Sequence, residues 1–69
     1  MNQNQSNTYR MLYEDFKKLV LNKPETSKVL NVSIQTLDRM RKSGQIKSKR
    51  INRGIFFSIK DIANYIDEE

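Results

Sequence analysis

Boundary signals for two short, consecutive helices most constrain what this chain can fold into. Asn22 and Glu25 have the three-residue spacing of a capping box. Pro24 fits the first helical turn, where its missing N–H would have no intrahelical partner anyway. Asn31 tolerates the left-handed conformation that ends many helices. These residues predict a first helix over about residues 23–30.

The second helix is predicted after a turn of about three residues. Ser33 is a good N-cap, and Gly44 is a C-terminal stop. Between them Leu37 and Met40 form an apolar inner face, so we expect a helix from Ile34 to about Lys42 or Ser43. A helix, a short turn and a second helix make a helix-turn-helix arrangement.

A hairpin is predicted next, because the spacing of the apolar residues shortens. Two strand-like runs, at about 46–51 and 55–58, flank the turn residues Asn52, Arg53 and Gly54. Of the two adjacent aromatic residues, we expect Phe56 to anchor the core and leave Phe57 unassigned.

A short amphipathic helix is predicted to end the domain, over about residues 59–67. Ser58 and Asp61 form its capping pair, and Ile62, Tyr65 and Ile66 form its apolar face. The expected fold is mostly α with a small β wing. It contains three helices plus a short antiparallel hairpin over residues 21–67, and a third strand, if present, would come from near Leu21.

The N-terminal part of the chain is predicted to add one more helix. Residues 1–7 have no apolar side chain after Met1 and are expected to form a disordered tail. An extra amphipathic helix is expected over residues 8–20, with an apolar stripe of Tyr9, Leu12, Tyr13, Phe16, Leu19 and Val20. Two roles stay open for this stripe: packing on the chain's own core, or forming a homodimer or cooperative assembly.

The charge of the chain is concentrated in its middle. The net charge is +5, eight of the 13 basic residues lie between positions 39 and 60, and no acid lies between Asp38 and Asp61. A basic segment between acidic ends indicates a surface that binds a polyanion, and double-stranded DNA is the partner we expect.

The composition argues against other classes of protein. Without cysteine or histidine, the chain lacks disulfides, thiolate metal sites and the commonest general base, so we expect no enzyme, no metal and no cofactor. Its apolar runs are only a few residues long, and its first eight residues are too polar for a signal peptide, so we expect no membrane partner. A cytoplasmic, nucleoid-associated protein without a small-molecule ligand is the expectation.

A set of residues between Leu21 and Ile66 occurs in a characteristic order and spacing: Val29–Ser33, Thr36-Leu37, Arg39, Gly44–Ile46, Arg50, Gly54, Phe56, Asp61-Ile62 and Tyr65-Ile66. In this set the segment resembles the excisionase/MerR-like winged helix-turn-helix domains of phage, plasmid and bacterial DNA-binding proteins. The helix over residues 8–20 lies outside this resemblance, and Asn31 stands where such domains usually have Gly.

The second helix is the candidate recognition helix for the major groove of DNA. Gln35 could contact adenine and Arg39 guanine, each through a bidentate hydrogen bond. Asp38 could accept a hydrogen bond from a cytosine amino group, or orient Arg39 or another basic neighbour. The full set of candidate contacts on this helix is Ser33, Gln35, Thr36, Asp38, Arg39 and Lys42.

The hairpin is the candidate wing. The resemblance implies that its tip approaches the DNA backbone or the adjacent minor groove, with Arg53 as the main contact. Lys47 and Lys49 alternate with Ile46 and Ser48 and are expected to share one exposed strand face. The candidate wing contacts are Lys47, Lys49, Arg50, Asn52 and Arg53.

The leading functional hypothesis is sequence-specific binding of double-stranded DNA. A small transcriptional regulator and an excisionase-type recombination directionality factor fit this sequence equally. The alternative is a protein-interaction adaptor that docks a partner on the Tyr9–Val20 helix. Binding of RNA or single-stranded DNA is a third hypothesis, and it would need exposed aromatic side chains on the hairpin.

Overall fold

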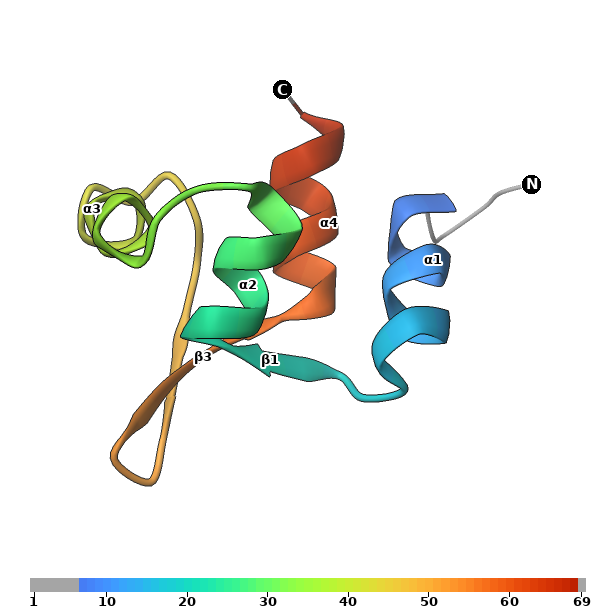
Figure 1. The fold of residues 1–69 in the computed structure, drawn as a ribbon, viewed down its shortest axis with the longest axis horizontal. Helices are drawn as coiled ribbons and strands as arrows, with labels where there is room; N and C mark the ends of the chain where they lie inside the picture. The colour runs from blue at the N-terminus through green and yellow to red at the C-terminus, as the bar shows by residue number, and fades with distance from the viewer. Residues whose placement is uncertain (1–6, 69) are drawn as a thin grey trace.

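The computed structural model describes residues 7–68, and within them the chain forms four helices and one three-stranded antiparallel sheet (Figure 1). This arrangement confirms the predicted winged helix-turn-helix fold, mostly helical with a small β wing. The elements in chain order are α1 (Asn7–Phe16), β1 (Val20–Asn22), α2 (Lys23–Leu30), α3 (Ile34–Lys42), β2 (Lys49–Ile51), β3 (Gly54–Ser58) and α4 (Ile59–Asp67).

Helix α2 begins and ends where its capping residues predicted. Asn22 Oδ1 accepts a hydrogen bond from Glu25 N at 2.9 Å, and Asn22 N donates to Glu25 Oε1 at 3.0 Å, which completes the capping box. Asn31 takes a left-handed φ of 58°, and its N–H donates to the carbonyl of Lys28. Val32 N–H then donates to the carbonyl of Ser27, so the carbonyls of Ser27 and Lys28 near the end of the helix are satisfied.

Helix α3 follows after the expected short turn. Ser33 Oγ accepts a hydrogen bond from Thr36 N at 3.0 Å and caps the helix. At the other end Gly44 has a φ of 84°, a conformation that favours glycine, and Gln45 N–H donates to the carbonyl of Met40. Both ends of the predicted helix are therefore confirmed.

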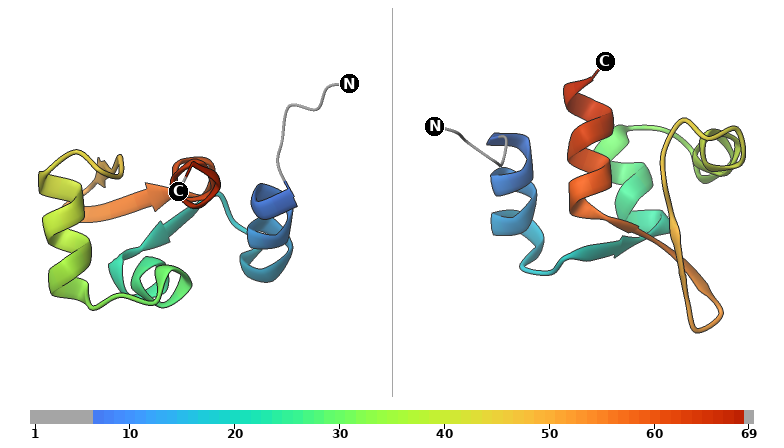
Figure 2. Two further views of the ribbon diagram at one scale, coloured as in Figure 1. Left: turned by 90° about the horizontal axis from the view of Figure 1, so that it is seen from above. Right: turned by 180° about the vertical axis from the view of Figure 1, so that it is seen from behind.

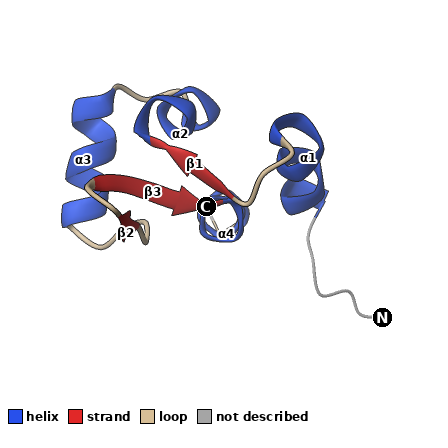
Figure 3. Cartoon of the chain, turned by 90° about the horizontal axis from the view of Figure 1, so that it is seen from below, coloured by secondary structure: helices blue, strands red, loops and turns tan. Residues whose placement is uncertain are grey.

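The sheet has the strand order β1-β3-β2, so β3 is central (Figure 3). The third strand comes from near Leu21, as predicted, and Leu21 pairs with Phe57. Both side chains are fully buried, whereas Phe56 points to the opposite face of the sheet and is half-buried. The prediction that Phe56 anchors the core was wrong, because the register of β3 on β1 places Phe57 there instead.

The hairpin is shorter than predicted. Strand β2 begins at Lys49 and not at the predicted position 46. Ile46 lies in the loop before the strand, where its side chain is buried in the core. The turn consists of Asn52 and Arg53, with Asn52 at a φ of 56°, and Gly54 is already the first residue of β3. Gly54 is needed for space rather than for the turn, since a Cβ there would lie 2.8 Å from Cε1 of Phe56.

The core lies between the sheet and the four helices. Helix α1 packs antiparallel on α4, with Thr8 Oγ1 donating to Asp67 Oδ1 at 2.7 Å where the start of α1 meets the end of α4 (Figure 1). Tyr9 and Phe16 pack against the core at this contact. The buried apolar side chains are Leu12, Leu21, Leu37, Met40, Ile46, Phe57, Ile59, Ile62 and Ala63.

Helix α1 ends four residues earlier than the predicted end at position 20. Lys17 takes a left-handed φ of 57°, and its N–H donates to the carbonyl of Tyr13 at 2.7 Å. Val20 is taken into β1, where it pairs with Ser58, and Leu19 is 59% exposed. Sheet pairing therefore overrides the helical spacing of the last two apolar residues.

The predicted disordered tail over residues 1–7 is partly corrected, since Asn7 is the first residue of α1 and residues 1–6 lie outside the described part. None of the helices in residues 7–68 has the length and apolar content needed to cross a bilayer.

Candidate nucleic-acid interface

Helix α3 buries one side and exposes the other. Leu37 and Met40 are 0% and 6% exposed, so the helix is fixed to the core through them. Gln35, Arg39 and Lys42 recur at steps of four and three residues and are all exposed, which places them on one outward face. This face carries an amide and two cationic groups, which are the functional groups that hydrogen-bond to base edges and phosphates.

Ser33 and Thr36 lie at the start of this face. Beyond its capping bond, Ser33 Oγ also donates to Thr36 Oγ1 at 3.0 Å. Ser33 is exposed and Thr36 is half-buried. The two hydroxyl groups are thus engaged with each other and with the first turn of α3, and their structural role is helix capping.

Asp38 lies half-buried on the flank of α3 and binds two cations. Lys23 Nζ is 3.0 Å from Asp38 Oδ1 and 3.3 Å from Oδ2. Arg41 donates to Oδ1 through Nη2 at 3.2 Å and Nε at 3.3 Å. Asp38 therefore orients Arg41 and Lys23, which agrees with the predicted alternative of a basic neighbour other than Arg39.

Hydrogen bonds to cations lower the pKa of two carboxyl groups in this region. The hydrogen bond from Lys23, and then that from Arg41, hold the pKa of Asp38 below its ordinary value. The hydrogen bond from Lys18, and then that from the backbone of Asn22, do the same for the pKa of Glu25. Both groups are thus carboxylates at neutral pH.

The wing, defined as the hairpin of β2 and β3 over residues 49–58, carries exposed cations on both of its faces. Lys49 pairs with Phe56, and the next residue, Arg50, pairs with Ile55. Because neighbouring residues of a strand point to opposite faces, Lys49 and Arg50 lie on different sides of the hairpin. Arg53 is exposed in the turn beside Asn52.

Helix α3 and the wing lie at the same end of the molecule. In Figure 1 and in both views of Figure 2, α3 and the wing stand at one end, α1 stands at the other, and α4 lies between them. A single extended partner could therefore contact α3 and the wing together without touching α1.

Comparison with known proteins agrees with this geometry. A family model described as a helix-turn-helix domain matches residues 20–69. The chain belongs to the helix-turn-helix domain family. The match begins at β1, so it includes the wing and leaves α1 outside. No curated protein matches the chain. Helix-turn-helix domains are DNA-binding modules, and here α2 and α3 are the two helices of the motif.

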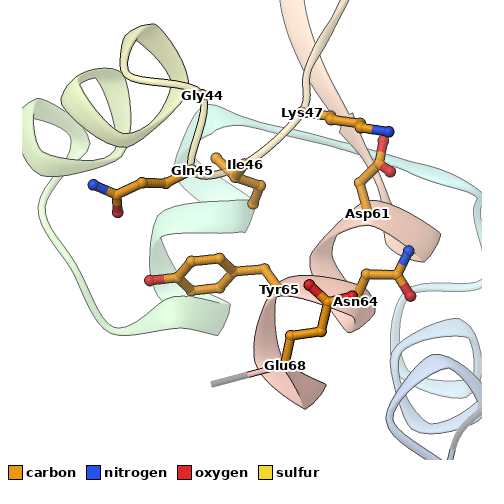
Figure 4. Close-up of a pocket in the computed structure, with 8 residues that line it drawn as sticks. All are labelled: Gly44, Gln45, Ile46, Lys47, Asp61, Asn64, Tyr65 and Glu68. Carbon is orange, nitrogen blue, oxygen red and sulfur yellow. The ribbon is translucent and has the colours of Figure 1, made fainter.

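Lys47, one of the predicted wing contacts of this helix-turn-helix domain, lies just before the hairpin. Lys47 precedes β2 and lines a pocket of about 530 Å³ between the loop after α3 and helix α4 (Figure 4). Asp61 and Glu68 of α4 line the same pocket. Lys47 and Lys49 are both exposed, but β2 begins at Lys49, so Lys47 lies outside the strand.

Sequence reasoning missed two cations of the domain, Lys23 and Arg41. Arg41 is three residues after Asp38, a spacing at which side chains on a helix meet, so this pair could have been found. Lys23 is 15 residues before Asp38, and no local pattern indicates that contact. Among the described residues no group of three His, Cys, Asp or Glu side chains could hold a metal ion.

Proposed function

We propose that this helix-turn-helix domain binds double-stranded DNA sequence-specifically, with α3 in the major groove and the wing on the backbone or adjacent minor groove. The observation that carries the proposal is the exposed set Gln35, Arg39 and Lys42 on α3, a helix that lies at the same end of the molecule as the basic wing (Figure 1). A major groove about 12 Å wide admits one α-helix, which suits a single outward face of this kind.

The side chains divide into two groups by the contacts they suit. Gln35 and Arg39 are the base readers, because their planar groups make bidentate hydrogen bonds to adenine and guanine. Lys49, Arg50 and Arg53 supply sequence-independent attraction to phosphates. Asn52 contributes by setting the turn, since its left-handed φ presents Arg53 at the wing tip.

We assign the domain to a small transcriptional regulator or an excisionase-type recombination directionality factor. Both roles use the same DNA-binding surface, and DNA bending separates them: a directionality factor is expected to bend its site, which permuted-fragment electrophoresis measures. One α3 covers few base pairs, so tandem or paired copies on DNA are part of the proposal.

The adaptor alternative is not carried further, because Leu12, Tyr9 and Phe16 of its stripe pack on the domain's own core.

The first test compares duplex and single-stranded DNA. Fluorescence anisotropy is measured for the protein with a mixed-sequence duplex and with the matching single strand, each at low and moderate salt. We expect tighter binding to the duplex, with an affinity that falls steeply as salt rises. No duplex binding at low salt would overturn the proposal.

The second test separates base reading from phosphate contact. After a preferred site is selected from a random library, Arg39→Ala should weaken binding to that site by about 1–3 kcal/mol and relax preference at one position. Lys49→Ala should instead weaken binding evenly on all sequences. Equal losses for Arg39→Ala on preferred and random duplexes would show that Arg39 contacts only phosphate.

A further inference from the structure

A carboxylate is an unexpected group beside a surface meant for phosphates, and Asp38 is the only acid in the chain between Glu25 and Asp61. It lies one residue before Arg39 on α3, and its side chain is 30% exposed. An unpaired carboxylate in this position would repel DNA. Its presence therefore needs a reason beyond general solubility.

The contacts of Asp38 resemble those that a DNA phosphate would make. A guanidinium group reaches Oδ1 through two nitrogens, at 3.2 and 3.3 Å, and an ammonium group binds at 3.0 Å. Arg and Lys bind phosphate oxygens with similar geometry. Lys23 and Arg41 are thus already paired within the protein, and their side chains are 29% and 22% exposed.

The pairing of Lys23 and Arg41 with Asp38 lowers the sequence-independent affinity of the protein for DNA. Sequence-independent affinity comes from cations that replace counterions on phosphates, so a cation held by a carboxylate contributes less to it. Contacts made by Gln35 and Arg39 to base edges are not reduced in the same way. The carboxylate therefore increases the difference in affinity between preferred and random DNA sites.

We propose that Asp38 is a specificity-determining residue, which holds Lys23 and Arg41 as an internal substitute for phosphate and so suppresses binding to non-preferred DNA. The same contacts join α3 to Lys23, the first residue of α2. The inference rests on the proposed function, because it concerns how this surface discriminates among duplexes.

The test measures affinity for the preferred and mixed-sequence duplexes over a series of salt concentrations, with wild type and Asp38→Asn. Asn keeps the shape of the side chain and removes its charge. We expect affinity for the mixed-sequence duplex to rise about 3- to 10-fold, and the slope of log affinity against log salt to steepen by about 1–2. The ratio of preferred to mixed-sequence affinity should fall.

Asp15→Asn is the matched control. It changes the net charge by the same amount, but Asp15 is exposed on α1, at the end of the molecule away from α3 (Figure 1). Both affinities should stay within about 2-fold of wild type, because charges beyond a Debye length of about 10 Å are largely screened. Equal effects of Asp15→Asn and Asp38→Asn would show that only net charge matters and would overturn the inference.

A double-mutant cycle tests the mechanism. In a Lys23→Gln/Arg41→Gln background, Asp38→Asn should no longer steepen the salt slope, since there are no cations left to release. An unchanged steepening would mean that Asp38 repels phosphates directly, and the inference would be wrong. Circular dichroism melting of each variant shows that the compared proteins are folded.

The outcomes also separate this inference from the function on which it rests. A wild-type protein that binds no duplex overturns the proposed function and this inference with it. If the wild-type protein binds duplex, but Asp38→Asn has the same salt slope and the same sequence preference as wild type, the inference alone is overturned.

Discussion

Thr26 of α2 is the residue whose environment fits its side chain least well. It is 0% exposed, and its Oγ1 is a buried oxygen that accepts and donates no hydrogen bond. A buried hydroxyl without a partner costs about 1–3 kcal/mol of desolvation. We therefore expect Thr26→Val, which replaces the hydroxyl with a methyl group of similar size, to raise the free energy of unfolding by about 1 kcal/mol. Urea denaturation measures this change.

Thr26→Ser is the control for that prediction, because it keeps the hydroxyl and removes the methyl group. It should lower the free energy of unfolding by about 1 kcal/mol, through lost apolar burial and a small cavity. A destabilising Thr26→Val variant would show that the hydroxyl finds a partner in solution.

At the level of elements, the wing depends on the contact between Gly54 and Phe56. A Cβ on residue 54 would meet the Phe56 ring at 2.8 Å, so Gly54→Ala must turn the ring away from the strand. We expect this substitution to destabilise the domain by about 1 kcal/mol, as small overpacking changes do. Thermal unfolding measures it, and Phe56→Leu is the background for comparison. In that background the cost of Gly54→Ala should largely disappear; an equal cost in both backgrounds would place its cause in the backbone instead.

Helix α1 is an integral element of the domain core, although it lies outside the family match. Leu12 is 8% exposed, while its neighbour Met11 is 65% exposed. Leu12→Ala should lower the free energy of unfolding by about 2–4 kcal/mol, because it leaves a cavity between α1 and α4. Met11→Ala should change it by less than about 0.5 kcal/mol, as surface substitutions do. Similar, small effects of both variants in urea denaturation would mean that α1 detaches from α4 in solution.

At the level of the whole molecule, two ion-paired carboxylates make stability depend on pH. The pKa values of Glu25 and Asp38 are lowered from ordinary values of 4.5 and 3.8. The unfolded chain therefore binds protons at a higher pH than the folded chain does, and the contribution of these groups is complete above about pH 5.5. It is lost as the pH falls through the lowered pKa values of the folded protein.

The measurement is the free energy of unfolding of wild type and of Glu25→Gln/Asp38→Asn between pH 7 and pH 3. We expect the difference between the two proteins to be largest at pH 7 and to shrink as the pH falls. Raising the salt concentration should reduce the difference at pH 7, since these pairs are partly exposed. A difference that stays constant with pH would show that the carboxylate charges do not stabilise the fold.

Much of the fold follows from local chemistry. The caps at Asn22, Asn31, Ser33 and Gly44 act within three or four residues of themselves, so they define α2 and α3 in any context that permits a helix. Likewise the outward position of Gln35 and Arg39 follows from helical periodicity once Leu37 is inside.

Capping, periodicity and charge are properties of neighbouring residues, so they were enough to predict the two helices of the motif, the hairpin and the basic segment. Contacts between residues far apart in the chain were set only when the elements packed together. Pairing with β1 selected Phe57 over Phe56 for the core and ended α1 before Val20. The packing of α2 on α3 brought Lys23 to Asp38, across 15 positions of the chain. No short-range pattern contains such contacts, since they arise only when separate elements meet around one core.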